Sequence, residues 1–434
     1  MASDDEVPFT VTEKGVSVPS GAHTGTFATL KIRNYRLFWS GNLANFFAMM
    51  MQSPAQAWLA YELTRSPLML GLVSAAWALP ICLFSFIGGV FIDRFQKRNL
   101  LILGQACSAV LMLAIGILIA TGHIQYWHLL MTAFINGTLS SFSFPTSQAL
   151  IPELVPRNKL FNAIALNSAG FNITRVAGPA LSGTLIGLGG ASAAYFTAVG
   201  FFALAVVLTS MLPPTSRIVT GIRRSIKKEL QEGFGYLRAH SIILTLIAME
   251  IVLNVLGMPF QNLMPVFADI FRVQAFGYGM LMAITGVGAL IGSLGIATFN
   301  HRIRARGRFL LTSGITYGMT LIVFATSPYW GSALGLGGST VFAASVILML
   351  VGIFSTFYLS TSNTTIQMMV TDEVRGRVMG VYGIVMGLMP LGVLPAGAVA
   401  EVIGAPLTIT MLGALLTGFM LAMGIFAVSV RKLT

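Results

Sequence analysis

Charged side chains are scarce in this chain: Asp, Glu, Lys and Arg make up only 9% of its 434 residues, whereas 55% of the residues are hydrophobic. Soluble globular domains carry about 25% charged residues, so the composition excludes a soluble or disordered protein. Cysteine is also scarce. The two cysteines, Cys82 and Cys107, both fall inside apolar runs, which excludes a disulfide framework. The composition therefore predicts an all-α protein that crosses a membrane many times.

Motifs that would indicate an enzyme are missing as well. The sequence has no Gly-Lys-Ser/Thr phosphate loop, so ATP is not expected to drive its activity. Its five histidines are scattered and lack the spacing of metal ligands. We therefore expect no enzymatic activity, no metal and no cofactor. The net charge of +12 lies in short loops between apolar runs, which argues against nucleic acid as a partner.

Twelve apolar runs, each about 20 residues long or longer as a bilayer span requires, alternate with polar loops. The predicted spans are residues 37–62, 69–92, 99–121, 127–151, 158–187, 190–212, 240–268, 277–299, 307–327, 339–364, 374–402 and 406–430. They divide the chain into an N-terminal tail (1–35), a six-helix half (36–212), a middle loop (213–239) and a second six-helix half (240–430). Corresponding loops of the two halves are faintly similar, which indicates a parallel repeat.

Lysine and arginine are distributed unevenly over this topology. All but three of the 26 lie in the two termini, the middle loop and the loops on the same side of the membrane. The exceptions are Arg65 and Arg272 on the opposite side and Arg175 within a span. Because loops rich in Lys and Arg stay in the cytoplasm, we expect both termini there. Three acidic residues near the outer ends of spans are expected to have no special role: Glu62, Asp269 and Glu401.

The loop after the second span reads Gly89-x-x-x-Asp93-Arg94-x-x-Lys97-Arg98. This pattern resembles the signature of the major facilitator superfamily, at its expected position. Three further stretches resemble the drug:proton antiporter and transmembrane secretion effector branch, which includes enterobactin-exporter-like and macrolide-efflux-like proteins. These stretches are residues 58–71, 144–155 and 162–183.

The resemblance implies both a fold and a function. The fold would be the major facilitator fold, with two six-helix halves around a cavity near the midplane. The function would be export of small amphiphilic molecules of the drug or siderophore type, by proton antiport and alternating access, across the cytoplasmic (inner) membrane of a bacterium. The expected partners are this substrate, protons and membrane lipid, for a chain that acts as a monomer. Two alternatives stay open: a lipid or lysolipid transporter of the same fold, and a non-transporting receptor or scaffold.

Charged residues around the signature are expected to form a conformational latch. A carboxylate is stabilised at the N-terminus of a neighbouring helix, and the resemblance places Asp93 beside the start of the eleventh span. The adjacent bases would pair with Asp372 and Glu373, and Glu153 would pair with arginines within 302–308. The alternative is ordinary positive-inside charge. The latch residues are Gly89, Asp93, Arg94, Lys97, Arg98, Glu153, Asp372 and Glu373.

The fifth span contains Gly178-Pro179-Ala-Leu-Ser-Gly183, which resembles the antiporter-type motif of exporters. Proline removes a backbone hydrogen bond and kinks a helix, and small residues let helices approach closely. This stretch would form a surface on which the two halves slide or hinge. The alternative is ordinary packing of small residues.

Two ionisable residues lie deep within predicted spans, Arg175 and Glu250. Such a residue is costly at membrane depth and indicates a function. Glu250 lies near the midplane of the seventh span, where Asn254 and Gln261 follow on one face. It is the candidate for proton coupling; the alternatives are a contact with a cationic substrate and a structural hydrogen bond. Arg175 would tune a nearby acid in the coupling, bind an anionic group of the substrate, or hold helices together.

Polar residues repeat at helical spacing in the first, fourth, seventh and tenth spans. Because lipid penalises exposed amides, these faces are expected to look into the protein or into a water-filled cavity. The resemblance points the same way, since these four helices line the cavity in the superfamily. Hydrogen bonds between packed helices are the alternative. The cavity candidates are Asn42, Asn45, Met49, Gln52, Gln56, Asn136, Ser140, Asn254, Gln261, Tyr358 and Ser362.

Overall fold

The computed structural model describes residues 27–92, 96–214, 235, 238, 240–299, 305–335, 337–370 and 390–433. Over these ranges the secondary structure is helical, without a strand. Eight of the described helices are long and apolar enough to cross a membrane. The all-helical prediction is thus confirmed for the described residues, while the number of twelve spans stays a prediction. The predicted middle loop, 213–239, falls almost entirely outside the described ranges.

The first half of the chain consists of five long helices and two short 3₁₀ turns. These are η1 (Ala28–Lys31), α1 (Arg33–Thr64), α2 (Pro67–Ile92), α3 (Lys97–Ala120), α4 (Tyr126–Leu154), η2 (Arg157–Lys159) and α5 (Leu160–Ser210). Helix α5 includes two predicted spans. It is interrupted at Gly189 and Gly190, and Gly190 has a φ of 73°, a conformation that glycine adopts without steric cost. The two glycines therefore form the whole connection between these spans.

The second half contains more and shorter segments. These are α7 (Ser241–Gly257), α8 (Pro259–Asn262), α9 (Met264–Ile270), α10 (Gln274–Phe299), α11 (Arg306–Ala325), α12 (Ser327–Ala333), α13 (Ser339–Met369), α15 (Pro390–Ile403), α16 (Ala405–Phe426) and α17 (Val428–Arg431). The span predicted as one helix at 240–268 is divided into three. Pro259 and Pro265 stand at the starts of α8 and α9, where each removes a backbone N–H from the helical hydrogen bonding.

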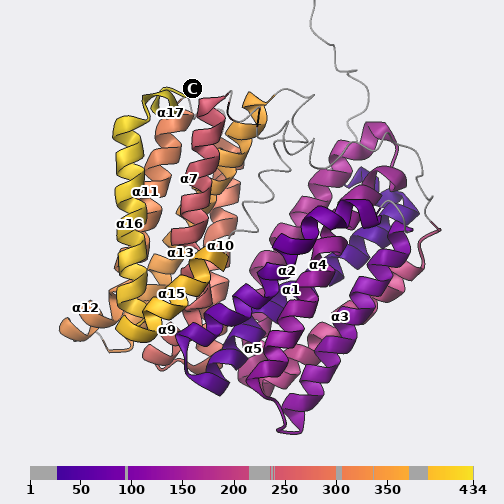
Figure 1. The fold of residues 1–434 in the computed structure, drawn as a ribbon, viewed down its shortest axis with the longest axis horizontal. Helices are drawn as coiled ribbons and strands as arrows, with labels where there is room; N and C mark the ends of the chain where they lie inside the picture. The colour runs from indigo at the N-terminus through magenta and orange to yellow at the C-terminus, as the bar shows by residue number, and fades with distance from the viewer. Residues whose placement is uncertain are drawn as a thin grey trace, which may run out of the picture.

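The helices form two groups that are close at one end and diverge toward the other (Figure 1). One group holds α1 to α5, packed chiefly through α1 with α5, α2 with α4 and α3 with α5; the other holds α7 to α17, packed around α10, α11, α13 and α16. We call the end at which α1 and α7 begin the terminal end, and the end at which α1 and α9 finish the opposite end. The two groups meet at the opposite end, where α9 and α15 lie against the first half.

The two halves meet mainly through two helix pairs, α5 with α10 and α2 with α15. Glycines allow this contact. A Cβ on Gly183 would overlap the backbone of Gly279, and one on Gly71 would lie 3.2 Å from the Cα of Leu394. Nearer the terminal end, a Cβ on Gly286 would lie 3.0 Å from the Cα of Val176. Small residues at these positions let the helix backbones touch directly.

We expect Gly183→Ala to destabilise the protein, because the added methyl group must push α5 away from α10. Overpacking of this kind costs about 1–3 kcal/mol, so the apparent Tm of the purified protein should fall. The matched control is Gly200→Ala in the same helix, where a Cβ would meet no atom within 4 Å. An equal Tm for the two variants would contradict the proposed tight contact.

Candidate functional site

At the opposite end, Asp269 of α9 joins the two halves. Its carboxylate accepts a hydrogen bond from the Tyr61 hydroxyl (3.1 Å) and forms an ion pair with Arg65 (3.1 Å). Arg65 follows α1 in a left-handed conformation with a φ of 53°. Its guanidinium lies 5.6 Å from the centre of the Tyr61 ring, within the range of a cation–π interaction. Asp269 is therefore bound by two side chains of the first half.

Glu401 of α15 forms a second bridge at the same end. It accepts hydrogen bonds from the Ser66 hydroxyl (2.7 Å) and from the backbone N–H of Leu68 (3.1 Å). Asp269 and Glu401, for which the sequence indicated no special role, thus each connect the two halves. Their partners lie more than 200 residues away in the chain, and the two sites carry no local motif. We call the six residues of both bridges the opposite-end contact: Tyr61, Arg65, Ser66, Leu68, Asp269 and Glu401.

At the terminal end, three of the predicted latch residues make contacts within their own half. Lys97 forms an ion pair with Glu153 and donates a hydrogen bond to the carbonyl of Ala149 at 3.3 Å. Arg98 donates to the carbonyl of Ser210. Glu153 was predicted to pair with arginines within 302–308; in this conformation it pairs with Lys97, because α3 and α4 pack side by side within the first half. Gly89 lies in α2, and the latch residues that fall outside the described ranges are Asp93, Arg94, Asp372 and Glu373.

The Lys97–Glu153 pair is mostly buried, with side-chain exposures of 11% and 20%. Removing one partner of a buried pair leaves an uncompensated charge and costs about 3–5 kcal/mol. We therefore expect Lys97→Met to lower the apparent Tm, and the double variant Lys97→Met/Glu153→Leu to recover most of that loss. Thermal unfolding of the purified protein checks both. If Lys97→Met melts like the wild type, the ion pair contributes nothing.

Several predicted cavity residues make hydrogen bonds inside the first half. Asn42 donates to the side chain of Asn167 at 2.6 Å, and Gln56 donates to the carbonyl of Leu129 at 2.9 Å. Asn136 accepts a hydrogen bond from Ser108 at 3.0 Å. These contacts correspond to the alternative that the sequence left open, in which amides bind packed helices together. Of the remaining candidates in this half, Gln52 is buried, while Asn45, Met49 and Ser140 are half-buried.

The candidates of the second half are mostly buried within it. Glu250 is fully buried on α7, and Asn254 donates its side-chain hydrogen bond to the backbone carbonyl of Glu250 at 2.9 Å. Tyr358 and Ser362 on α13 are also fully buried. Gln261 was predicted on the same helical face as Glu250, but it belongs to the separate segment α8. The polar face of the seventh span is therefore divided, and its first part points into the second half.

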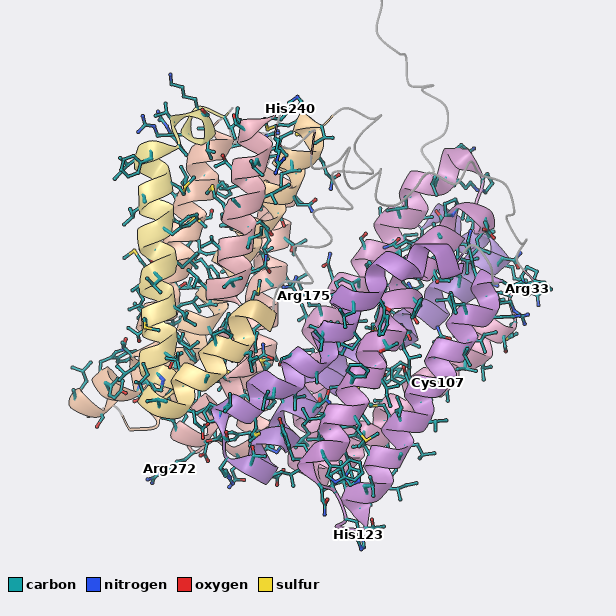
Figure 2. The ribbon with its side chains drawn as sticks, viewed as in Figure 1. Arg33, Cys107, His123, Arg175, His240 and Arg272 are labelled. Carbon is teal, nitrogen blue, oxygen red and sulfur yellow. The ribbon has the colours of Figure 1, made fainter. Side chains whose placement is uncertain are left out.

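Arg175 differs from the other charged residues of the described spans. Its side chain is exposed and lies between the two halves in Figure 2. It forms no ion pair with Glu250, although both residues are described. The next residue, Val176, is the point at which α5 touches Gly286 of α10. Arg175 thus lies on the terminal side of the contact between the halves.

Helix α5 also presents polar residues that the sequence analysis missed. Ser168 and Asn172 precede Arg175 by seven and three residues, so the three side chains lie on the same helical face. Both are exposed, as Arg175 is, whereas Val176 at the contact with α10 is half-buried. The polar face thus begins where α5 leaves α10 and continues toward the terminal end. The helical spacing of these three residues is present in the sequence. That they face away from α10 follows only from the position at which α10 packs against α5.

The glycines of the helix-5 motif have separate partners. A Cβ on Gly178 would lie 2.5 Å from the Cβ of Met50 on α1, whereas Gly183 faces α10. Pro179 lies between them inside α5. The motif therefore packs one helix against both halves. Within the described residues, no group of three His, Cys, Asp or Glu side chains could hold a metal ion.

Comparison with solved structures shows which fold this arrangement represents. A POT family transporter in complex with 5-aminolevulinic acid superposes with a TM-score of 0.69 at 13% identity, covering 92% of this chain and 97% of the other. A bacterial homologue of the human lysosomal transporter Spinster, in an inward-facing and unoccupied conformation, gives a TM-score of 0.67 at 14% identity, covering 95% and 98%. At these identities the likeness establishes the fold alone.

Sequence relatives indicate the family. The multidrug efflux pump Tap of Mycolicibacterium fortuitum is 26% identical over 87% of this chain and 90% of its own length. The enterobactin exporter EntS of Escherichia coli is 25% identical over 77% of this chain and 74% of its own length. The family model described as transmembrane secretion effector matches residues 24–433. The chain therefore belongs to the transmembrane secretion effector family of major facilitator transporters.

Proposed function

We propose that this protein is a secondary active transporter that exports small amphiphilic molecules, of the drug or siderophore type, by proton antiport with alternating access. The observation that carries the proposal is the one-sided contact between the halves, which join at the opposite end and diverge toward the terminal end. Relatives named as efflux pumps and exporters support the direction and the class of substrate.

The distribution of basic residues supports an orientation. With the terminal end in the cytoplasm of a bacterium, nearly all lysines and arginines lie on the inner side of the membrane, as the positive-inside rule requires. Arg65 and Arg272 are then at the outer surface. The end at which the halves diverge then faces the cytoplasm in this state, and a molecule to be exported would enter from that side. The terminal end closes, and the opposite end opens, when the molecule is released.

The opposite-end contact has the strength that such a cycle requires. The side chains of Arg65 and Asp269 are 63% and 52% exposed. Exposed ion pairs contribute about 0–1 kcal/mol, and hydrogen bonds between neutral groups contribute about 1 kcal/mol each. Interactions of this strength favour the joined state of the opposite end without preventing the contact from breaking. The polar bridges therefore add only a small cost in free energy to separation of the halves at this end.

We assign proton coupling to Glu250. It is fully buried in α7, and an ionisable residue at membrane depth is costly and indicates a function. The same segmented helix continues through α8 and α9 to Asp269 of the opposite-end contact. The breaks at Pro259 and Pro265 lie between the two acids. A change of charge at Glu250 is thereby connected through one helix to the contact that closes the outer face.

We expect Glu250→Gln to abolish substrate-induced dissipation of a pH gradient in inside-out vesicles, since the amide cannot carry the proton. The panel contains lipophilic cations, macrolides and catechol siderophores. Glu62→Gln is the control, because Glu62 is an exposed acid near the opposite end of α1. The rate should fall at least tenfold in the first variant and remain unchanged in the second. Equal dissipation by wild type and Glu250→Gln would assign the proton to another acid.

We expect Asp269→Asn to shift the protein toward conformations with a separated opposite end, because the ion pair to Arg65 is lost. The shift is limited to about fivefold in population, the equivalent of about 1 kcal/mol. Spin labels at positions 123 and 334, in a chain whose Cys82 and Cys107 are replaced by alanine, report the distance between the halves. Glu62→Gln serves again as the control. An unchanged distance distribution in Asp269→Asn would refute the role of this contact.

A further inference from the structure

Arg175 lies near the middle of the first part of α5. This part runs from Leu160 to the interruption at Gly189, so Arg175 is about 15 residues from one end and about 14 from the other. At 1.5 Å per residue, it lies about 20 Å from either end of this part. An arginine at such a depth is costly unless it is paired or faces water. We therefore expect an acidic side chain, a hydrogen-bond acceptor or water beside its guanidinium.

The described residues do not compensate the charge of Arg175. Arg175 donates no hydrogen bond to them and forms no ion pair with them, whereas Arg65, Lys97 and Arg98 each have an acceptor. The nearby phenol hydroxyl of Tyr317, in the second half, already donates to the carbonyl of Gly257 at 2.9 Å. Arg175 is exposed as a residue and lies between the halves (Figure 2). No acceptor among the described residues takes up its five N–H donors, so they can bind a molecule that enters there.

The acids of the described spans lie elsewhere. Glu153 is paired with Lys97 at the terminal end, and Glu250 is buried in the second half without an ion pair to Arg175. On the two turns of α5 that precede Arg175, the exposed side chains are uncharged and include Ser168 and Asn172. Among the described residues, the charge beside Arg175 is therefore the positive charge of this side chain. Such a site attracts anions and repels lipophilic cations.

We propose that Arg175 is the receptor for an anionic group of the transported molecule, and that amphiphilic carboxylates are a substrate class of this protein. The planar guanidinium fork matches a carboxylate with two parallel hydrogen bonds. The side-chain amide of Asn172 and the hydroxyl of Ser168 lie one and two turns away on the same face of α5 and supply further polar contacts. The assignment rests on the proposed export function, in that binding precedes transport at the same site.

The test uses three probes with one aromatic body and different charge: pyrenebutyrate, pyrenebutanol and pyrenebutyl-trimethylammonium. Binding to the full chain in nanodiscs is measured by equilibrium dialysis at neutral pH, with empty nanodiscs subtracted. The wild type should bind pyrenebutyrate about tenfold or more tightly than pyrenebutanol, the size expected for a charge-assisted hydrogen bond. The ammonium probe should bind most weakly. The reverse order in the wild type would overturn the proposal without any variant.

Two variants of Arg175 distinguish the effect of its charge from that of its planar geometry, and a third variant is the control. Arg175→Gln should bind pyrenebutyrate and pyrenebutanol equally, with the affinity for pyrenebutanol retained. Arg175→Lys keeps the charge but loses the planar fork, so it should show an intermediate preference. Arg33→Gln removes one exposed positive charge at the start of α1 and should behave like the wild type. If Arg175→Gln still prefers pyrenebutyrate over pyrenebutanol as the wild type does, the preference does not come from Arg175. The same conclusion follows if Arg33→Gln loses the preference.

Export is measured separately, so the two proposals fail in different ways. If inside-out vesicles transport a neutral macrolide but the protein shows no Arg175-dependent preference for pyrenebutyrate, the export function stands and the anion site is refuted. If no compound is transported while the Arg175-dependent preference persists, the anion site stands and the export function is refuted.

Discussion

The contact between α5 and α10 is the constraint on which the rest of this structure depends. At Gly183 and Gly279 the two backbones touch, and a side chain on either residue would overlap the other helix. Two groups of helices whose backbones touch this closely can tilt about the contact but cannot slide freely past each other. The contact therefore separates two regions. On its terminal side lies the exposed Arg175, and on its opposite side the halves are joined by polar bridges.

Those two regions are complementary in their chemistry. The bridges at the opposite end are hydrogen bonds and an ion pair among groups such as Tyr61 and Asp269 that find their partners within the protein. The region around Arg175 contains a donor without a protein acceptor among the described residues. Under the function proposed above, the bridged end would be the gate and the region around Arg175 would be the binding surface. The two would then lie on different sides of the contact between α5 and α10, as alternating access requires.

Much of the helical architecture follows from the sequence, because apolar runs and loop charges are properties of local segments. The short connection between the fifth and sixth spans, predicted at 188–189 and found at Gly189 and Gly190, and the deep positions of Arg175 and Glu250 follow from the sequence for the same reason. The division of the seventh span into α7, α8 and α9 was not predicted, although Pro259 and Pro265 signal it, because proline is tolerated in membrane helices. Hydropathy alone therefore predicts one continuous span, whereas the structure has three helical segments there.

The partners of individual side chains were predicted poorly. Asp269 and Arg65 are 204 residues apart, and Glu401 and Ser66 are 335 residues apart, so no local spacing connects them. The amide face of the first span was interpreted mainly as a cavity lining, but Asn42 and Gln56 are used in packing. A polar stripe in a membrane helix indicates that it avoids lipid. It does not distinguish a neighbouring helix from water, and only the packing of α4 and α5 against α1 makes that distinction.

In the opposite-end contact, the hydrogen-bond donors and the acceptors come from different halves of the protein. Its donors, Arg65, Tyr61, Ser66 and the Leu68 N–H, all come from the first half, and its acceptors, Asp269 and Glu401, both come from the second. With the proposed orientation, this set of charges is in contact with the external medium. Exposed charges are screened over about 8 Å at physiological ionic strength. In that orientation, the salt concentration outside the cell would act on this contact directly, whereas the salt concentration of the cytoplasm would not.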